Sequence, residues 1–350
     1  MSILFLTKGK LHPWLLRLAD NFTIYYPIQL ENKTHYKKLD NTFLTVTESD
    51  LVDSLQKIRP VESLKGFFFN PKIKVAGLKD TATIDIPFPQ SSRIIFGAKN
   101  CDLRPLKVHE KMYLENEFVD PFYQSLLEKT IIIAADCPMP EQTCFCNLLE
   151  LKPYPEENAD IIFSIIPNGY ILETTSEKGE ALLRDFNHLF REAKSEDLIL
   201  RDENRKKAIA LLDNFNPNSW REDLAKAIED KKDEKFWQEQ AKTCVECFGC
   251  LMVCPTCFCF LLYDTPIAES EKTKGFERYK VWDACYYSAY ARVGGGMNPR
   301  AEFWKRFRNR FHCKFMNFFN DYKFNACSGC GRCFSVCMGK IDIRKILAHI

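Results

Sequence analysis

The stretch KTCVECFGCLMVCPTCFCF, residues 242–260, holds six cysteines. The first four are spaced C-x2-C-x2-C-x3-C and are followed by Pro255, which is the ligand spacing of bacterial ferredoxins. The same cysteine spacing returns in CSGCGRCFSVC, residues 327–337. Structural zinc sites usually take their four ligands from two separated pairs, whereas each run here supplies four by itself. The sequence therefore predicts two 4Fe-4S clusters.

The two runs are expected to exchange one ligand. In two-cluster ferredoxins the fourth cysteine of each run binds the cluster held by the first three of the other run. The predicted ligands are Cys244, Cys247, Cys250 and Cys337 for one cluster, and Cys327, Cys330, Cys333 and Cys254 for the other. Met338 stands where a proline usually follows the fourth cysteine, but proline is not a ligand.

Residues 255–326 separate the runs by far more chain than a compact ferredoxin uses. Residues 279–293 and 298–319 carry apolar side chains at roughly helical spacing. We therefore predict an α-helical dicluster ferredoxin domain over 241–350. The charged, cysteine-free residues upstream predict a helical connector over 201–240.

The N-terminal part has a different pattern. RIIFG at 93–97 and TIIIAA at 130–135 are β-branched runs typical of strands, and Asn168-Gly169 is a hairpin signal between two apolar runs. Helical patterns lie between and after these runs, as in residues 177–193. An α/β or α+β domain is predicted over 1–200.

Both strand-like runs lead into cysteines. Because neighbouring parallel strands bring their carboxyl-end loops together, these cysteines are candidates for a third Fe-S cluster. They are Cys101, Cys137, Cys144 and Cys146. The alternative is a set of buried structural thiols, since free cysteine is often buried and the C-x-C spacing is awkward for one cube.

The amino-acid composition limits which classes of function are expected. The 350 residues are 46% hydrophobic with a net charge of +2, which favours neither nucleic-acid nor anionic-membrane binding. No signal-peptide core or membrane span is recognisable, so a cytoplasmic protein is expected. Sixteen cysteines in a reducing compartment indicate metal or redox chemistry rather than disulfides.

No catalytic residues are predicted. The chain lacks a dinucleotide loop, a P-loop and a nucleophile elbow, and its six histidines are scattered without metal-site spacing. For Cys257 and Cys259 packing is favoured, with a redox thiol near the first cluster as the alternative. Cys285 and Cys313 are expected in the core. The basic residues of 300–314 predict a solvated helix face or a surface for an acidic partner.

Several motifs resemble one family. They are FGAKNCDLRPL, DCPMPEQTCFC, CPTCFCF, VWDACYYSAYARVGGG and IDIRKIL. Over residues 90–350 the chain resembles the iron-sulfur beta subunit of cytoplasmic sulfhydrogenases and the related iron-sulfur subunit of anaerobic sulfite reductase. The resemblance implies a non-catalytic subunit that relays electrons between a flavin subunit using NAD(P)H and a terminal catalytic subunit of the hydrogenase or sulfite reductase kind.

A second function class is an iron-sulfur subunit of a heterodisulfide reductase-like enzyme, which acts on thiols and disulfides. Such proteins carry adjacent Cys-Cys pairs. This sequence contains none. The electron relay is therefore the favoured interpretation.

Overall fold

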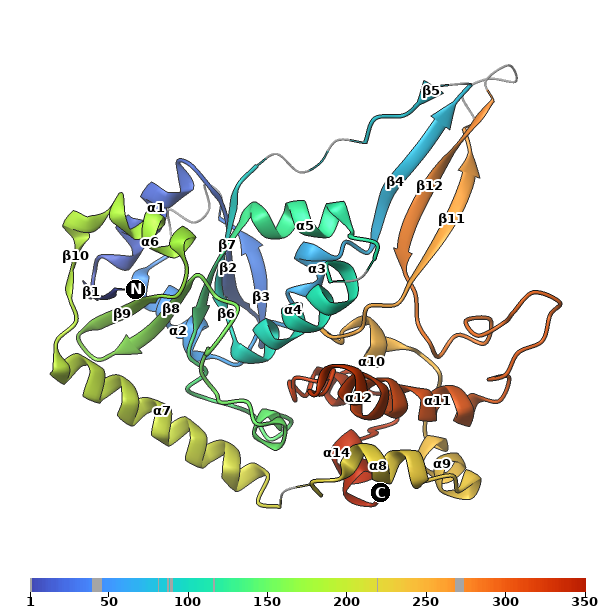
Figure 1. Cartoon of the computed structure of the whole chain (residues 1–350). Helices are drawn as coiled ribbons and strands as arrows, with labels where there is room; N and C mark the ends of the chain where they lie inside the picture. The colour runs from blue at the N-terminus through green and yellow to red at the C-terminus, as the bar shows by residue number, and fades with distance from the viewer. Residues whose placement is uncertain are drawn as a thin grey trace.

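The computed structural model describes residues 2–39, 46–80, 82–86, 88, 91–115, 117–218, 220–267 and 274–350. Its N-terminal part is built on an eight-stranded sheet (Figure 1). The strands are β1 (Ile3–Thr7), β2 (Thr23–Leu30), β3 (Lys33–Lys38), β6 (Arg93–Ala98), β7 (Thr130–Ala135), β8 (Ile161–Ile166), β9 (Gly169–Thr174) and β10 (Phe190–Glu192). Their order is β10-β1-β9-β8-β7-β6-β2-β3, and the four strands β2, β6, β7 and β8 are parallel.

Helices cover both faces of this sheet. Helices α1 (Leu11–Ala19), α2 (Glu48–Gln56) and α6 (Glu177–Arg184) pack on one face, and α3 (Lys65–Phe68), α4 (Asn100–Tyr113) and α5 (Pro121–Glu128) on the other. Strand β6 alternates accordingly, because Ile94 and Phe96 face the first layer while Ile95 faces the second. The predicted mixed α/β organisation is confirmed.

Most of the expected strands are present. The runs at 93–97 and 130–135 are β6 and β7, and they are parallel neighbours. The hairpin is β8–β9, with its two-residue turn at Pro167–Asn168, one position earlier than the motif suggested. The helix expected over 177–193 ends at Arg184. The prediction is wrong beyond that point because residues 190–192 pair with β1 as an edge strand.

A second, antiparallel sheet extends away from the main body (Figure 1). It contains β11 (Phe260–Pro266), β12 (Gly275–Trp282), β4 (Lys72–Lys79) and β5 (Ala82–Thr83), in that order. We call β4, β11 and β12 the arm. The arm joins the N-terminal part to the cysteine-rich part, because β4 pairs with β12. The helical expectation is wrong for 279–293, because residues 279–282 lie in β12 and residues 283–293 form turns and loops. It is right for residues 303–311, 312–317 and 318–322.

The rest of the chain is mostly helical. It contains α7 (Ser195–Phe215), α8 (Leu224–Asp230), α9 (Glu234–Ala241), α10 (Gly249–Met252), α11 (Phe303–Phe311), a π-helix (His312–Asn317), α12 (Phe318–Tyr322), α13 (Arg332–Ser335) and α14 (Ile343–Ala348), plus short 3-10 turns at Cys146–Leu149 and Asn187–Leu189. Trp237, Phe307, Phe311 and Phe315 form the centre of its core. In the described part of the chain, no helix combines the length and apolar content needed to cross a membrane.

Candidate metal centres

The N-terminal cysteines come together as the sequence predicted. Cys101, Cys137, Cys144 and Cys146 line one pocket. Cys101 lies in the first turn of α4, directly after β6, and Cys137 follows β7, so the parallel pairing of these strands brings the two cysteines to one edge of the sheet. We call these four residues the sheet-edge set.

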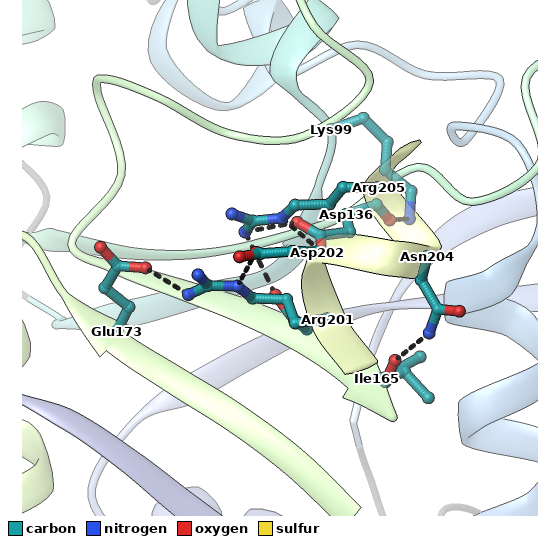
Figure 2. Close-up of polar contacts among 9 residues, drawn as sticks. Lys99, Asp136, Ile165, Glu173, Arg201, Asp202, Asn204 and Arg205 are labelled. Atoms are coloured by element: carbon teal, nitrogen blue, oxygen red, sulfur yellow. Dashed lines mark hydrogen bonds and ion pairs between the residues drawn. The ribbon is translucent and has the colours of Figure 1, made fainter. Parts of the chain in front are cut away.

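Polar contacts fix the loop that carries Cys137 (Figure 2). The carboxylate of Asp136 accepts two hydrogen bonds of 3.0 Å from Nε and Nη2 of Arg205 on α7. The ammonium of Lys99 donates to the backbone oxygen of Asp136 at 2.7 Å. It also donates to the backbone oxygen of Leu55 at 2.6 Å. These bonds hold the Lys99 charge beside Cys137 and Cys101.

The charge balance of this pocket fits an anionic cofactor. Arg59 and Lys99 are both buried on its wall, and Nε of Arg59 has no hydrogen-bond partner among the described residues. Burial lowers the pKa of Lys99, and it raises the pKa of Cys137 to about 11, so as a free thiol Cys137 is neutral at pH 7. Buried cations next to neutral groups are costly. Thiolates bound to an iron-sulfur cluster supply the negative charge that balances them.

A second pocket holds the first of the predicted C-terminal ligand sets. It is lined by Cys244, Cys247, Cys250 and Cys337, which we call the first set, together with Cys333. The buried guanidinium of Arg310 lies on the same wall, close to Cys250 and Cys333. Cys337 therefore lies with the first three cysteines of the other run, as crossed ligation requires.

A buried lysine lies beside two of the other C-terminal cysteines. Cys254, Cys327, Cys330 and Cys333, the second set, interact electrostatically with one another. Lys314 lies beside Cys254 and Cys327, and its ammonium donates to Oγ1 of Thr256 (2.7 Å) and the backbone oxygen of Ala326 (3.2 Å). Burial raises the pKa of Cys327 to about 12, whereas the contact with Cys257 and the charge of Lys314 hold the pKa of Cys254 well below its ordinary value. The second set therefore places a buried cation beside a thiol that ionises readily.

The second set and the sheet-edge set are adjacent. The amide of Phe145 donates to the backbone oxygen of Gly329 at 2.8 Å, and Cys330 shares the wall of the sheet-edge pocket. Gly331 has a φ of +73°, and a Cβ there would lie 2.3 Å from the backbone oxygen of Thr143. Only glycine allows this backbone-to-backbone contact. The two cysteine loops are therefore packed directly against each other.

The buried side chain of Arg332 stabilises the same contact between the two cysteine loops. It forms a buried ion pair with Asp102 of α4, with 2.8 Å between Nη1 and Oδ1. It also donates to the backbone oxygens of Pro60 (2.8 Å), Val61 (3.1 Å) and Glu62 (3.1 Å). Sequence reasoning missed Arg332. One signal was available in the sequence. Arg332 is a charged residue inside a cysteine run, and such a run is expected to be buried where its cysteines bind a cluster.

A zinc ion and a multi-iron cluster require different arrangements of four cysteines. Among the described residues, no three His, Cys, Asp or Glu side chains converge closely enough to hold a single metal ion. The four sulfurs of a structural zinc site converge on one ion at about 2.3 Å. Thiols that line the walls of a pocket are better arranged for a multi-iron cluster.

Comparison with known proteins agrees with this chemistry. Residues 243–341, which include both C-terminal sets, match the family described as a 4Fe-4S dicluster domain. The chain is 29% identical over 335 residues to sulfhydrogenase 2 subunit beta of Pyrococcus furiosus, and the aligned region covers 95% of this chain and 94% of that protein. The similarity therefore extends through the N-terminal sheet as well as the cysteine-rich part.

Proposed function

We propose that this chain, an iron-sulfur protein related to a sulfhydrogenase beta subunit, relays electrons between a flavin subunit that uses NAD(P)H and a terminal catalytic subunit of the hydrogenase or sulfite reductase kind. A bound 4Fe-4S cluster supplies one-electron chemistry. The observation that carries the proposal is the direct packing of the sheet-edge set against the second set through Phe145 and Gly329.

The proposed ligands are those of the three sets. The first and second sets each hold one 4Fe-4S cluster, with Cys254 and Cys337 exchanged between the runs, and the sheet-edge set holds a third. The helices α10 and α13, which carry Cys250 and Cys333, contact each other, and this contact supports the proposal of an α-helical ferredoxin domain. The proposed domains are 1–200, a connector over 201–240, and 241–350.

The buried cations have a defined part in this function. Arg310, Lys314 and Lys99 each lie beside cysteines of a different set. A positive charge near a cluster favours the reduced form, which carries one more negative charge. These residues therefore hold the reduction potentials above those of clusters in an uncharged environment.

The purified single chain is expected to show no NAD(P)H oxidation, no hydrogenase activity and no sulfite reduction, while the complex that contains it loses NAD(P)H-coupled turnover when the chain is removed. The reason is that no nucleotide loop or substrate-activating group is present in the sequence. Native purification with identification of the accompanying subunits, followed by activity assays of the separated chain, measures this. Turnover of NAD(P)H by the chain free of any flavin subunit contradicts the relay.

Replacing Cys101 and Cys146 together with serine is expected to remove about four iron atoms per chain while the iron of the C-terminal sets stays. Iron and sulfide analysis of the anaerobically purified full chain is the measurement. Thr143→Ser, in the same loop, is the control and keeps the full iron content. If the double variant retains all the iron of the unaltered protein, the four residues are structural thiols and the third cluster is wrong.

A further inference from the structure

The first set reaches the surface of the molecule. All sixteen cysteines fall in the described part of the chain, and Cys247 of the first set is the only one of them that is exposed. In the second set Cys254, Cys330 and Cys333 are buried. The first set is therefore the place where a redox group of another protein can come closest to a proposed iron ligand.

The first set is also one end of the series of cysteine sets. Cys333 of the second set lines the pocket of the first set, and Cys330 of the second set lines the sheet-edge pocket. The second set therefore lies between the other two. Electrons that pass along the whole series enter or leave it at the first set or at the sheet-edge set.

Apolar side chains surround Cys247 on the surface. Met338 is 75% exposed, Val245 63% and Tyr287 38%. Val245 and Met338 line the same pocket as Cys247, and the centre of the Tyr287 ring lies 4.7 Å from that of Phe248 on the pocket wall. We call Val245, Tyr287 and Met338 the first-set patch. Single exposed apolar residues are ordinary, whereas a connected group of them is typical of an interaction site.

Two loops that are far apart in the sequence build this patch. Oγ1 of Thr243 donates to the backbone oxygen of Gly339 at 3.0 Å, and a Cβ on Gly339 would overlap the backbone oxygen of Thr243. This close contact holds Val245 of one cysteine run near Met338 of the other. Met338 also occupies the position where a proline usually follows the fourth cysteine. Methionine is a flexible apolar residue that is enriched at protein interfaces.

The charges beside the patch are of both signs and are mostly paired. Lys242 pairs with Glu239 at 3.4 Å, and Glu246 pairs with Arg306 at 3.0 Å. Lys340 is the other charged residue next to the patch in these two loops. A diffusing electron carrier is guided to its partner by a surface that carries mainly one sign of charge. The first-set patch instead fits a subunit that stays bound through apolar contacts.

We propose that the first-set patch is the docking surface for the flavin-bearing subunit. The inference rests on the proposed electron relay. The dimethylbenzene edge of a flavin contains only carbon and hydrogen, so it fits an apolar surface around Cys247 without leaving a buried polar group unpaired. One electron at a time passes between the flavin and the chain. No bond forms or breaks, and one partner is oxidised as the other is reduced.

Photo-crosslinking tests the docking surface in the intact complex. The photoreactive residue p-benzoylphenylalanine replaces Met338 in one sample. In the control sample it replaces Ile199, which is 58% exposed on α7, a helix that packs against β8 and β9. The probe at position 338 is expected to crosslink to a peptide of the flavin-bearing subunit, which mass spectrometry identifies, and the control probe is not expected to reach that peptide. A crosslink from position 338 to the catalytic subunit or to a second copy of this chain overturns the inference.

A charge-introducing variant gives a second measurement. Val245→Glu/Met338→Glu is expected to weaken binding of the flavin-bearing subunit at least about a hundredfold, because two carboxylates would be buried without partners. Its iron content and its electron paramagnetic resonance signals are expected to stay unchanged, because neither side chain is a ligand. Ile199→Glu is the matched control and keeps full affinity. Titration of the separated subunits, followed by flavin fluorescence, measures the binding. A double variant that keeps its iron and its affinity contradicts the docking surface.

Failure of this inference is distinguishable from failure of the relay. A native chain that purifies without any flavin-bearing subunit contradicts the relay and the docking surface together. A complex that contains this subunit, but gives no crosslink to it from position 338, contradicts the docking surface and leaves the relay intact. The crosslink also decides the result if the double variant loses its iron.

Discussion

Cys254→Ser is expected to alter the same cluster signal as Cys330→Ser, although Cys254 belongs to the other cysteine run. Cys254 interacts with Cys327 and Cys333, whereas Cys337 lines the pocket of Cys244 and its neighbours. Loss of one of four thiolate ligands destabilises the cluster it binds, so up to about four iron atoms are lost from one cluster and the other is retained.

The matched control is Cys337→Ser, which is expected to alter the signal that Cys247→Ser alters. The four single variants therefore fall into two pairs, and each pair joins residues from different runs. Electron paramagnetic resonance of the reduced, anaerobically purified chains, together with iron analysis, distinguishes the pairs. If Cys254→Ser instead shares its lost signal with Cys247→Ser, ligation is local to each run and the crossed assignment is wrong.

The sequence predicts the parts of this structure that depend on local spacing. Each cysteine run supplies its ligands within a few residues, and the β-branched runs at 93–97 and 130–135 specify strands through their own side chains. The convergence of Cys101 and Cys137 also follows from the sequence, since a parallel pair of strands ends at one edge.

The arm was not predictable in the same way. Residues 260–262 are all apolar and substantially exposed, so β11 lacks the alternation by which a half-buried strand is recognised. Its partner β12 pairs with β4, which comes from the N-terminal part of the chain. A pairing of such long range leaves no local signal in either segment.

The burial of the basic side chains was also not predicted from the sequence. The basic residues of 300–314 predicted a solvated helix face, yet Arg306, Arg310 and Lys314 are buried. The expectation is wrong for these three because their side chains point toward backbone oxygens and the cysteine sets instead of water. A prediction from the hydrophobic pattern assigns every charged residue to the surface. That prediction fails for a basic residue whose charge is balanced by buried negative charge nearby.

Arg332→Met is expected to produce the largest loss of stability among non-cysteine variants. Asp102, its ion-pair partner, is fully buried, and removing one member of a buried pair costs about 3–5 kcal/mol because the remaining charge is left without compensation. The three backbone oxygens of Pro60, Val61 and Glu62 lose their donor as well. The contact between the second and sheet-edge sets then opens more easily.

Two comparisons identify the cause of that loss. Arg278→Met breaks an exposed ion pair with Asp264 on the arm, which contributes little to stability because solvent screens it, and serves as the matched control. The double variant Asp102→Leu/Arg332→Met removes both buried charges and is expected to recover part of the stability, since a buried pair replaced by apolar groups is often tolerated. Urea unfolding of the anaerobic chain, followed by circular dichroism and by iron release to a chelator, measures all three. If Arg332→Met and Arg278→Met unfold at the same urea concentration, the buried ion pair between Asp102 and Arg332 does not hold the two cysteine loops together.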